Sequence, residues 1–472
     1  MGIGKTGAAA THAFGYATGM AESCPECSVL RQCVTELEAK VEQLTRLLEE
    51  QRRAGKRQAA PFSKGLPKGK AKKPGRKAGA KHGKHGHRPP PPADKIDETH
   101  DAPLPDVCPN CGGVVDETDI QQQFQVEIPR LPNHRQFNVH IGKCRRCQCR
   151  VQGRHPLQTS DALGAAASQL GPDAQAAVVD LNKNAGLSHG KIVRTMNHLF
   201  GISLTRGGSV HAVLRAGRRC TKVYQAICQS VRKSAWVVPD ETGWRVGGRS
   251  AWLHGFVGSH STAYVIDPNR DHQPAEQILG LDYAGAMVHD GWAPYDRFAK
   301  AAHQQCNQHI LRRCDEMLET ATRGAVHFPR RVATLLRQGL ALRDRHAAGE
   351  VSDHGRAVAR GRLQHALEDA VFPTKTAAVN ERLAKHLWKH KNAFFTYLRY
   401  PGLDATNWRA EQAMRFGVIL RKVWGGNRTW SGAKAQAILM SVWRTCWQQG
   451  RIALDFLSRL LRGQIEALAL PP

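Results

Sequence analysis

Three acidic residues stand where their carboxylates could act together. Asp240 and Asp290 each end an apolar run typical of a buried strand, and Glu411 lies in a later segment with helical periodicity. Asn407, Glu411 and Arg415 recur every four residues and would share one helix face. Carboxylate oxygens suit Mg²⁺ or Mn²⁺, and two such cations can stabilise both the attacking and the leaving oxygen at phosphorus. The pattern predicts a site for two divalent cations, with surface carboxylates as the alternative.

Residues next to these acids extend the prediction. Glu241 follows the first acid directly, and because side chains alternate along a strand it should face the opposite side. Arg421 and Lys422 follow Glu411 on the same segment. Together with Arg415, they are predicted to contact DNA phosphates.

Four cysteines form two Cys-x-x-Cys pairs, Cys108 with Cys111 and Cys144 with Cys147. Each pair can present two thiolates to one metal, and four thiolates in a tetrahedron suit one structural Zn²⁺. Alternating apolar residues between the pairs predict the hairpin of a zinc ribbon over residues 104–155. The chain has 13 cysteines, an odd number that fits metal ligation in a reducing compartment better than a disulfide framework. Four buried free cysteines are the alternative.

Two smaller motifs lack evident partners. Cys24 and Cys27 form a lone Cys-x-x-Cys pair that would need Cys33 or a second chain to complete a metal site. Cys306 and His309 form a Cys-x-x-His pair, read as a metal pair, a DNA contact or, as we prefer, the packed start of a helix.

The charge balance indicates a polyanionic partner. Lys and Arg number 68 against 40 Asp and Glu, a net charge of +28 that favours nucleic acid over a merely solvated basic surface. Residues 51–93 contain no acid and many Gly and Pro residues, which predicts a disordered linker that contacts phosphates. Its candidate DNA-binding residues are Lys64, Lys68, Lys70, Lys72, Lys73, Arg76 and Lys77. No apolar run approaches the roughly 18 residues of a membrane span, which excludes an integral membrane protein.

Periodicity then places helices before the acidic strands. A heptad pattern over residues 28–53 predicts a dimerising coiled coil, with an amphipathic helix packed on its own chain as the alternative. Residues 188–199 and 205–216 predict two short helices around a turn at Gly201, as in a helix-turn-helix, although other helical hairpins have the same pattern.

The second half of the chain changes character. Within residues 233–300, the apolar runs 235–240, 251–257, 263–266 and 286–290 predict strands and residues 274–281 predict a helix. Residues 310–400 and 405–465 predict helices. The expected organisation is therefore multidomain: an N-terminal segment with the heptad helix (1–53), a basic linker (54–103), a small zinc ribbon (104–155), a helical DNA-binding segment (156–232) and an α/β core (233–472).

The segments around the acids resemble one family. They are Asp240-Glu-Thr-Gly-Trp-Arg-Val, His289-Asp-Gly-Trp, Cys306-Asn-Gln-His-Ile-Leu-Arg-Arg, Asn407-Trp-Arg-Ala-Glu-Gln-Ala-Met-Arg and Arg421-Lys-Val-Trp. These segments and the order of the elements resemble the insertion-sequence-66 family of DDE transposases over nearly the whole chain from residue 28 onward. The run from Asn407 through Arg421-Lys422 is the most specific part of the resemblance.

The resemblance implies a ribonuclease H-like catalytic core with a helical insertion at about residues 315–400. Asp240, Asp290 and Glu411 would be its catalytic triad, holding Mg²⁺ or Mn²⁺. The expected reaction is cleavage at the terminal inverted repeats of an insertion sequence, followed by transfer of the freed 3′-hydroxyl to target DNA. We expect a homodimer or higher oligomer in the bacterial cytoplasm, associated with the nucleoid, and small companion proteins of the same element.

A second function explains part of the sequence. A non-catalytic, zinc-dependent DNA-binding regulator would account equally well for the charge, the cysteines and the heptads. It does not account for apolar strands that end in acids, nor for the segment around Glu411.

Overall fold

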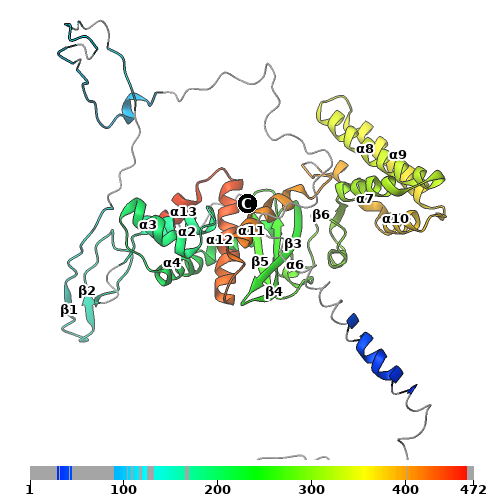
Figure 1. The fold of residues 1–472 in the computed structure, drawn as a ribbon, viewed down its shortest axis with the longest axis horizontal. Helices are drawn as coiled ribbons and strands as arrows, with labels where there is room; N and C mark the ends of the chain where they lie inside the picture. The colour runs from blue at the N-terminus through cyan, green and yellow to red at the C-terminus, as the bar shows by residue number, and fades with distance from the viewer. Residues whose placement is uncertain are drawn as a thin grey trace, which may run out of the picture. The chain divides into compact units, whose positions relative to one another are not determined.

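The computed structural model describes residues 29–30, 32–41, 43–44, 90–103, 105–107, 110–114, 116, 120–124, 132–164, 169–400 and 402–464 (Figure 1). The basic linker residues Lys64 to Lys77, the pair Cys24 and Cys27, and Cys108 lie outside this part of the chain. The chain divides into two compact units, Met1–His87 and Arg88–Pro472. In the described part, no helix is both long and apolar enough to span a membrane.

The described part of the first unit is helical, at residues 29–30, 32–41 and 43–44. Its apolar residues Leu30, Val34, Leu37 and Val41 follow the predicted heptad spacing and are between 51% and 64% exposed. The helix thus leaves its apolar seam uncovered in the single chain, and its pairing with a second chain stays a prediction.

Two small elements lie in the predicted ribbon. Strands β1 (Ile141–Lys143) and β2 (Arg150–Gln152) pair antiparallel on either side of the second Cys-x-x-Cys pair. The expected longer hairpin is not seen, because residues 120–124 and 132–140 form no strand. An isolated antiparallel bridge pairs Val107 with Val114, and Cys111 lies between these two residues in sequence.

A helical segment follows, made of α2 (Pro172–Lys183), α3 (His189–Phe200), α4 (Arg206–Arg219) and α5 (Thr221–Arg232). Helix α3 ends at Gly201, whose φ of 64° is the left-handed conformation that glycine adopts without strain. Helix α4 begins after Thr205, whose side chain accepts a hydrogen bond from Gly208 N–H. The glycine turn, the bounds of α3 and the start of α4 agree with the sequence prediction to within one residue, whereas α4 runs three residues beyond its predicted end at residue 216.

The core is a five-stranded sheet in the order β5-β4-β3-β6-β7. Its strands are β3 (Trp236–Val246), β4 (Arg249–Val257), β5 (Thr262–Asp267), β6 (Ala286–His289) and β7 (Ala302–Gln305). Strands β3, β4 and β5 form an antiparallel meander, whereas β6 and β7 run parallel to β3. Strand β3 continues six residues beyond Asp240, so this acid lies within the strand and not at its end as predicted.

Helices cover both faces of the sheet. Val237 and Met287 face one apolar cluster, which they share with α5, α6 (Gln273–Leu279) and α13 (Ala453–Leu461). Val238 and Val288 face a second cluster, which they share with α11 (Trp408–Trp424). Helix α12 (Trp430–Gln448) contributes to both clusters and closes the β5 edge.

The polar side chains of α12 satisfy that edge directly. Thr445 Oγ1 and Ser441 Oγ accept hydrogen bonds from the Thr262 and Tyr264 N–H groups at 3.1 and 2.9 Å. Strand β5 therefore does not present a free edge for pairing with another chain at these positions.

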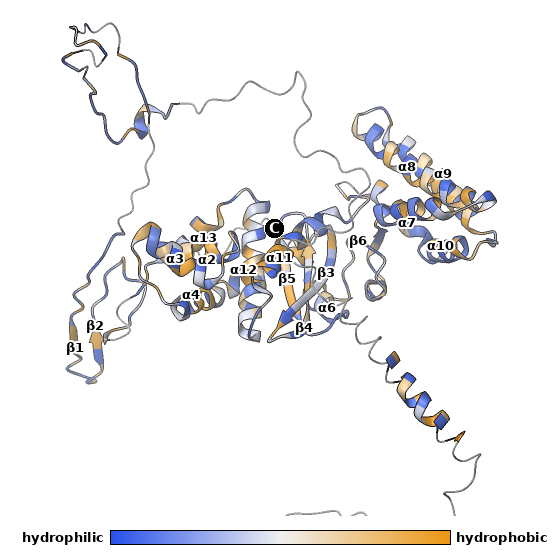
Figure 2. Cartoon of the chain, in the orientation of Figure 1, coloured by the Kyte–Doolittle hydropathy of each residue, from blue (hydrophilic) through white to orange (hydrophobic). Residues whose placement is uncertain are grey.

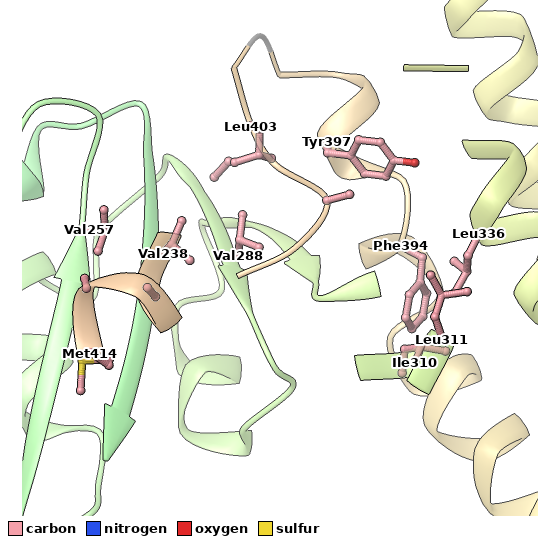
Figure 3. Packing of buried hydrophobic residues seen from close by; sticks show 14 of the residues in the cluster. Val238, Val257, Val288, Ile310, Leu311, Leu336, Phe394, Tyr397, Leu403 and Met414 are labelled. Atoms are coloured by element: carbon pink, nitrogen blue, oxygen red, sulfur yellow. The ribbon is translucent and has the colours of Figure 1, made fainter. Parts of the chain in front are cut away.

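Between β7 and α11 the chain forms a helical insertion of α7 (Asn307–Thr320), α8 (His327–Ala347), α9 (Asp353–Val371) and α10 (Ala378–Lys389). Hydrophobic and hydrophilic residues are interspersed along α8 and α9 (Figure 2), and on α8 the buried side chains, among them Val332, Leu336 and Leu342, form one packed face. Figure 3 shows one apolar cluster running from Val238 and Val257 of the sheet to Leu311, Leu336 and Phe394 of the insertion. The insertion is thereby anchored to the sheet.

Short 3-10 helices complete the described structure at Ala93–Lys95, Ala293–Arg297, Arg323–Val326, Lys391–Ala393 and Thr396–Leu398.

Candidate active site

Asp240 and Asp290 come from neighbouring parallel strands. Strands β3 and β6 run parallel, with Trp236 opposite Ala286 and Val237 opposite Met287. Extending this register by three residues sets Asp240 level with Asp290. The two acids therefore lie side by side at the carboxyl end of β6, although they are separated by 50 residues in sequence.

Glu411 approaches these two acids from the first turn of α11. Asp240 pairs with Gly255 of β4, and a Cβ atom on Gly255 would lie 2.7 Å from Met414 Sδ. A Cβ atom on Gly417 would collide with Leu253. These glycines let α11 lie directly on β4, which brings Glu411, one turn before Met414, beside β3.

The start of α11 is also tied to the end of β7. Asn407, which precedes the helix, is buried, and its N–H donates to Cys306 Sγ at 3.4 Å. Asn307 N–H donates to the Ala405 carbonyl at 2.9 Å. Cys306 thus packs at the start of α7, as the preferred interpretation of the Cys-x-x-His pair predicts, and its burial raises the pKa of its thiol. His309 Nδ1 is buried without a hydrogen-bond partner in the described chain.

The charges of the three acids act on one another. Burial is the largest cause that raises the pKa of Asp240 to about 7, and the nearby charges of Glu241, Asp290 and Glu411 contribute to that rise, against one lowering hydrogen bond from the Glu241 N–H. Asp290 and Glu411 are exposed, whereas Asp240 is partly buried. The repulsion among these negative charges therefore disfavours the ionised form of Asp240, the most buried of the three acids.

No basic residue in the described chain forms an ion pair with Asp240, Asp290 or Glu411. An acidic group that stays unneutralised in a chain of net charge +28 has the oxygen donors and the charge that suit divalent cations. In the described residues, however, no set of three or more His, Cys, Asp or Glu side chains is arranged to hold a metal ion. The oxygen donors suit such a cation, but the described carboxylates do not form a complete set of metal ligands.

Glu241 has a different environment. Arg270 donates to its Oε1 from Nη2 at 2.7 Å and from Nε at 3.1 Å, and the Tyr295 hydroxyl donates to its Oε2 at 3.0 Å. The Glu241 side chain is 3% exposed, and the Arg270 guanidinium lies 5.1 Å from the Trp292 ring centroid. Glu241 thus faces the side of β3 opposite α11 and is already satisfied. Neither Arg270 nor Tyr295 carries a sequence signal that would have identified it.

The basic residues of α11 divide into two kinds. Arg421 donates to the Gly243 carbonyl and, at 3.4 Å, to Thr242 Oγ1, so its guanidinium holds α11 against β3. Burial lowers its pKa, and its Nε is buried without a partner in the described chain. Arg421 is thus directed into the protein, whereas Arg415 and Lys422 are exposed and accessible to phosphate.

The second cysteine pair, Cys144 and Cys147, sits in a tight turn. Cys144 N–H donates to the Cys149 carbonyl at 2.9 Å, and Gln148 has a φ of 59° within this turn. Hydrogen bonds from Cys149 and from the Cys144 thiol lower the pKa of Cys147. Thiolate formation is thereby favoured at Cys147, as metal ligation requires. Cys111 is a free cysteine, and its partner Cys108 lies outside the described residues.

Comparison with known proteins adds one finding. Residues 167–435, more than half of the chain, match the family described as "Transposase IS66 family". The matched region includes Asp240, Asp290 and Glu411 and excludes the predicted ribbon. No curated protein matches the chain.

Proposed function

This chain belongs to the IS66 family of transposases, and from that premise we propose that it cuts DNA at the terminal inverted repeats of an insertion sequence and joins the ends to target DNA. Asp240, Asp290 and Glu411 are its catalytic residues in this proposal. The fold proposed for the core is ribonuclease H-like. A mixed five-stranded sheet, with acids on two neighbouring parallel strands and a third acid on a helix packed across it, supports that assignment.

One observation carries the proposal: the charges of Asp290 and Glu411 raise the pKa of Asp240, and none of these three acids has a basic partner in the described chain. Asp240, Asp290 and Glu411 would hold two Mg²⁺ or Mn²⁺ ions, which when bound supply Lewis-acid activation of water and of the phosphoryl oxygens. Asp290 and Glu411 are exposed, so a DNA phosphate can reach them. Arg415 and Lys422, exposed on the same helix, would hold neighbouring phosphates.

The remaining parts of the chain have proposed supporting roles. Cys108, Cys111, Cys144 and Cys147 would bind one Zn²⁺ and stabilise residues 104–155 for binding the terminal repeats. The heptad helix would pair protomers in a homodimer or higher oligomer, so that both ends of the element are cut together. Companion proteins of the same element and a bacterial cytoplasmic, nucleoid-associated location complete the proposal.

Cleavage of a labelled terminal-repeat duplex tests the function. The purified protein should nick the duplex in Mg²⁺ and leave it intact in EDTA, while binding it in both conditions. Binding of the repeat without nicking in Mg²⁺ or Mn²⁺ would favour the non-catalytic regulator and contradict the proposal.

A further inference from the structure

A basic cleft lies at the end of α11 opposite to Glu411. It has a volume of about 1030 Å³ and is walled by α3, by α4 and by the loop between α11 and α12. We call it the basic cleft, and its cationic residues are Lys183, Lys191, Arg194, Arg206 and Arg428. No Asp or Glu lines it, and none of the five forms an ion pair with an acid in the described chain.

Two of the cations, Lys191 and Arg206, stand where helices normally disfavour them. Helix N-termini carry partial positive charge, so acids are favoured and bases disfavoured in the first turn. Helix α3 has no acid in its first turn and places Lys191 there, with Arg194 in the next turn. Helix α4 begins with Arg206 and also has no acid in its first turn. A bound anion would offset this accumulated positive charge.

The floor of the cleft contains a buried cation. Lys183 is 2% exposed, donates to the neutral Gln436 Oε1, and lies 4.9 Å from the Trp424 ring centroid. Burial lowers its pKa to about 7. Trp424 Nε1, a donor that belongs to the same cleft, is buried without a hydrogen-bond partner in the described chain. A buried amine that lacks an acid and lies beside an unsatisfied donor is costly unless a ligand with acceptor oxygens completes the site.

The loop that carries Arg428 is held rigidly by β3. Trp244 Nε1 donates to Asn427 Oδ1 at 2.9 Å, and Asn427 N–H donates to the Arg245 carbonyl at 2.9 Å. Gly426, at φ 120°, has no room for a Cβ atom against that carbonyl. Arg428 is therefore presented to the cleft from a fixed backbone.

The lengths of α11 and β3 give the distance from the basic cleft to the acids. Along α11, 13 residues from Glu411 to Trp424 span about 20 Å. Along β3, six residues from Asp240 to Val246, which bridges Asn427, also span about 20 Å. Because nucleotides on one strand of B-DNA are about 3.4 Å apart, this distance corresponds to about six nucleotides.

We propose that the basic cleft binds the sugar–phosphate backbone of the DNA strand that is cut, about six nucleotides from the scissile phosphate. The inference rests on the proposed function, because the position is counted from the acids. Its size, at the upper end of the roughly 300–1000 Å³ of small-ligand pockets, suits a stretch of backbone better than one phosphate ion. The helical segment and the catalytic core would thus hold one strand from both sides.

Binding measurements in EDTA test the cleft separately from cleavage. The double variant Arg194→Ala/Arg206→Ala should lower affinity for a terminal-repeat duplex at least about tenfold, and should flatten the slope of log K against log salt by about 1.8. The matched control Arg330→Ala/Arg331→Ala removes two exposed charges from α8 and should leave the slope nearly unchanged. Lys183→Met should also weaken binding, without lowering the melting temperature, because it replaces a buried charge with an apolar chain of similar length.

Phosphate neutralisation then locates the contact. Methylphosphonates placed singly along the strand should weaken wild-type binding most at about five to seven nucleotides from the terminal nucleotide of the element, and the double variant should not sense those positions. The assignment is overturned if the cleft variant binds DNA as the control does. It is also overturned if free nucleoside triphosphate raises the melting temperature of the wild type alone while DNA binding is unaffected, since the cleft would then be a nucleotide site. Both readouts remain valid if the protein fails to cut DNA.

Discussion

The two ends of α11 have opposite electrostatic character. At its start, Glu411 joins Asp240 and Asp290, and in the described chain no base neutralises them. At its end, Trp424 lines the basic cleft, which contains no acid. Each end lacks the counter-charges that a folded protein normally supplies, and we propose that divalent cations supply them at one end and DNA phosphates at the other. On this proposal both ligands come from outside the chain, and α11 and β3 hold the two sites about 20 Å apart.

The largest expected effect concerns a segment that should be independent of α11. Removing zinc with a chelator, or replacing Cys144 by Ser, should unfold residues 104–155 and abolish binding of the terminal repeat, because zinc can contribute on the order of 10 kcal/mol to the folding of such small modules. The core should keep its melting transition. The replacement of Cys149, which lies in the same turn, by Ser is the matched control and should retain zinc. Metal analysis that finds no zinc in protein with all four thiols free would remove this claim.

A change of cation probes the acidic end. Replacing Mg²⁺ by Ca²⁺ should preserve DNA binding and lower the cleavage rate by roughly 10³-fold, because calcium has a larger and looser ligand shell. The same exchange should leave the phosphate contacts of the basic cleft unchanged. Equal cleavage rates in the two cations would argue against a site with strict geometry at Asp240, Asp290 and Glu411.

The raised pKa of Asp240 predicts that the stability of the metal-free protein depends on pH. This pKa is raised from 3.8 to about 7 in the native state, so the metal-free protein loses stability as the pH rises from about 4 to about 7. Asp240→Asn lacks that loss and should be more stable above pH 7, by on the order of 3 kcal/mol, with little difference below pH 4. Urea unfolding in EDTA at several pH values measures it. Glu316→Gln, an exposed change on α7, is the control, and a stability gain that is equal at every pH would contradict the assignment.

The smallest effect concerns the packing that joins the two ends. Gly417→Ala should destabilise the core by about 1–3 kcal/mol, because the added Cβ atom would meet Leu253 and push α11 away from β4. Gly361→Ala on α9, where no atom lies within 4 Å of the new Cβ position, should be neutral or stabilising by up to about 1 kcal/mol. Thermal unfolding of the two variants compares them. If Gly417→Ala is as stable as Gly361→Ala, close packing does not position Glu411.

Much of this architecture follows from local patterns. Apolar runs predicted β4, β5 and β6 to within two residues of their ends, and Gly201 predicted the turn between α3 and α4. Strand β7 was missed because its residues, Ala302–Gln305, are largely polar. Gln304 tolerates burial there because its Oε1 accepts from Tyr397 N–H at 3.0 Å, a contact made 93 residues away in sequence.

The charged residues show where such patterns fail. Arg421 holds α11 on β3 through its hydrogen bonds to that strand, a role that the sequence does not indicate, and its contact with phosphate stays a prediction. Lys183 follows the buried Ala176 and Val179 at helical spacing, and its ammonium group donates to Gln436 of α12. In both cases the hydrogen-bond partner is distant in sequence, so local periodicity does not reveal what the base contacts.

One measurement tests the central claim most directly: binding and nicking of a single labelled terminal repeat by Asp240→Asn, Asp290→Asn, Glu411→Gln and Glu241→Gln. The first three should bind as tightly as the wild type or more tightly, and nick at least about 10³-fold more slowly. Glu241→Gln should nick within about tenfold of the wild type, because that side chain pairs with Arg270 on the other face of β3. Wild-type nicking by all three of the first variants would contradict the catalytic assignment, and loss of nicking by Glu241→Gln alone would move it to Glu241.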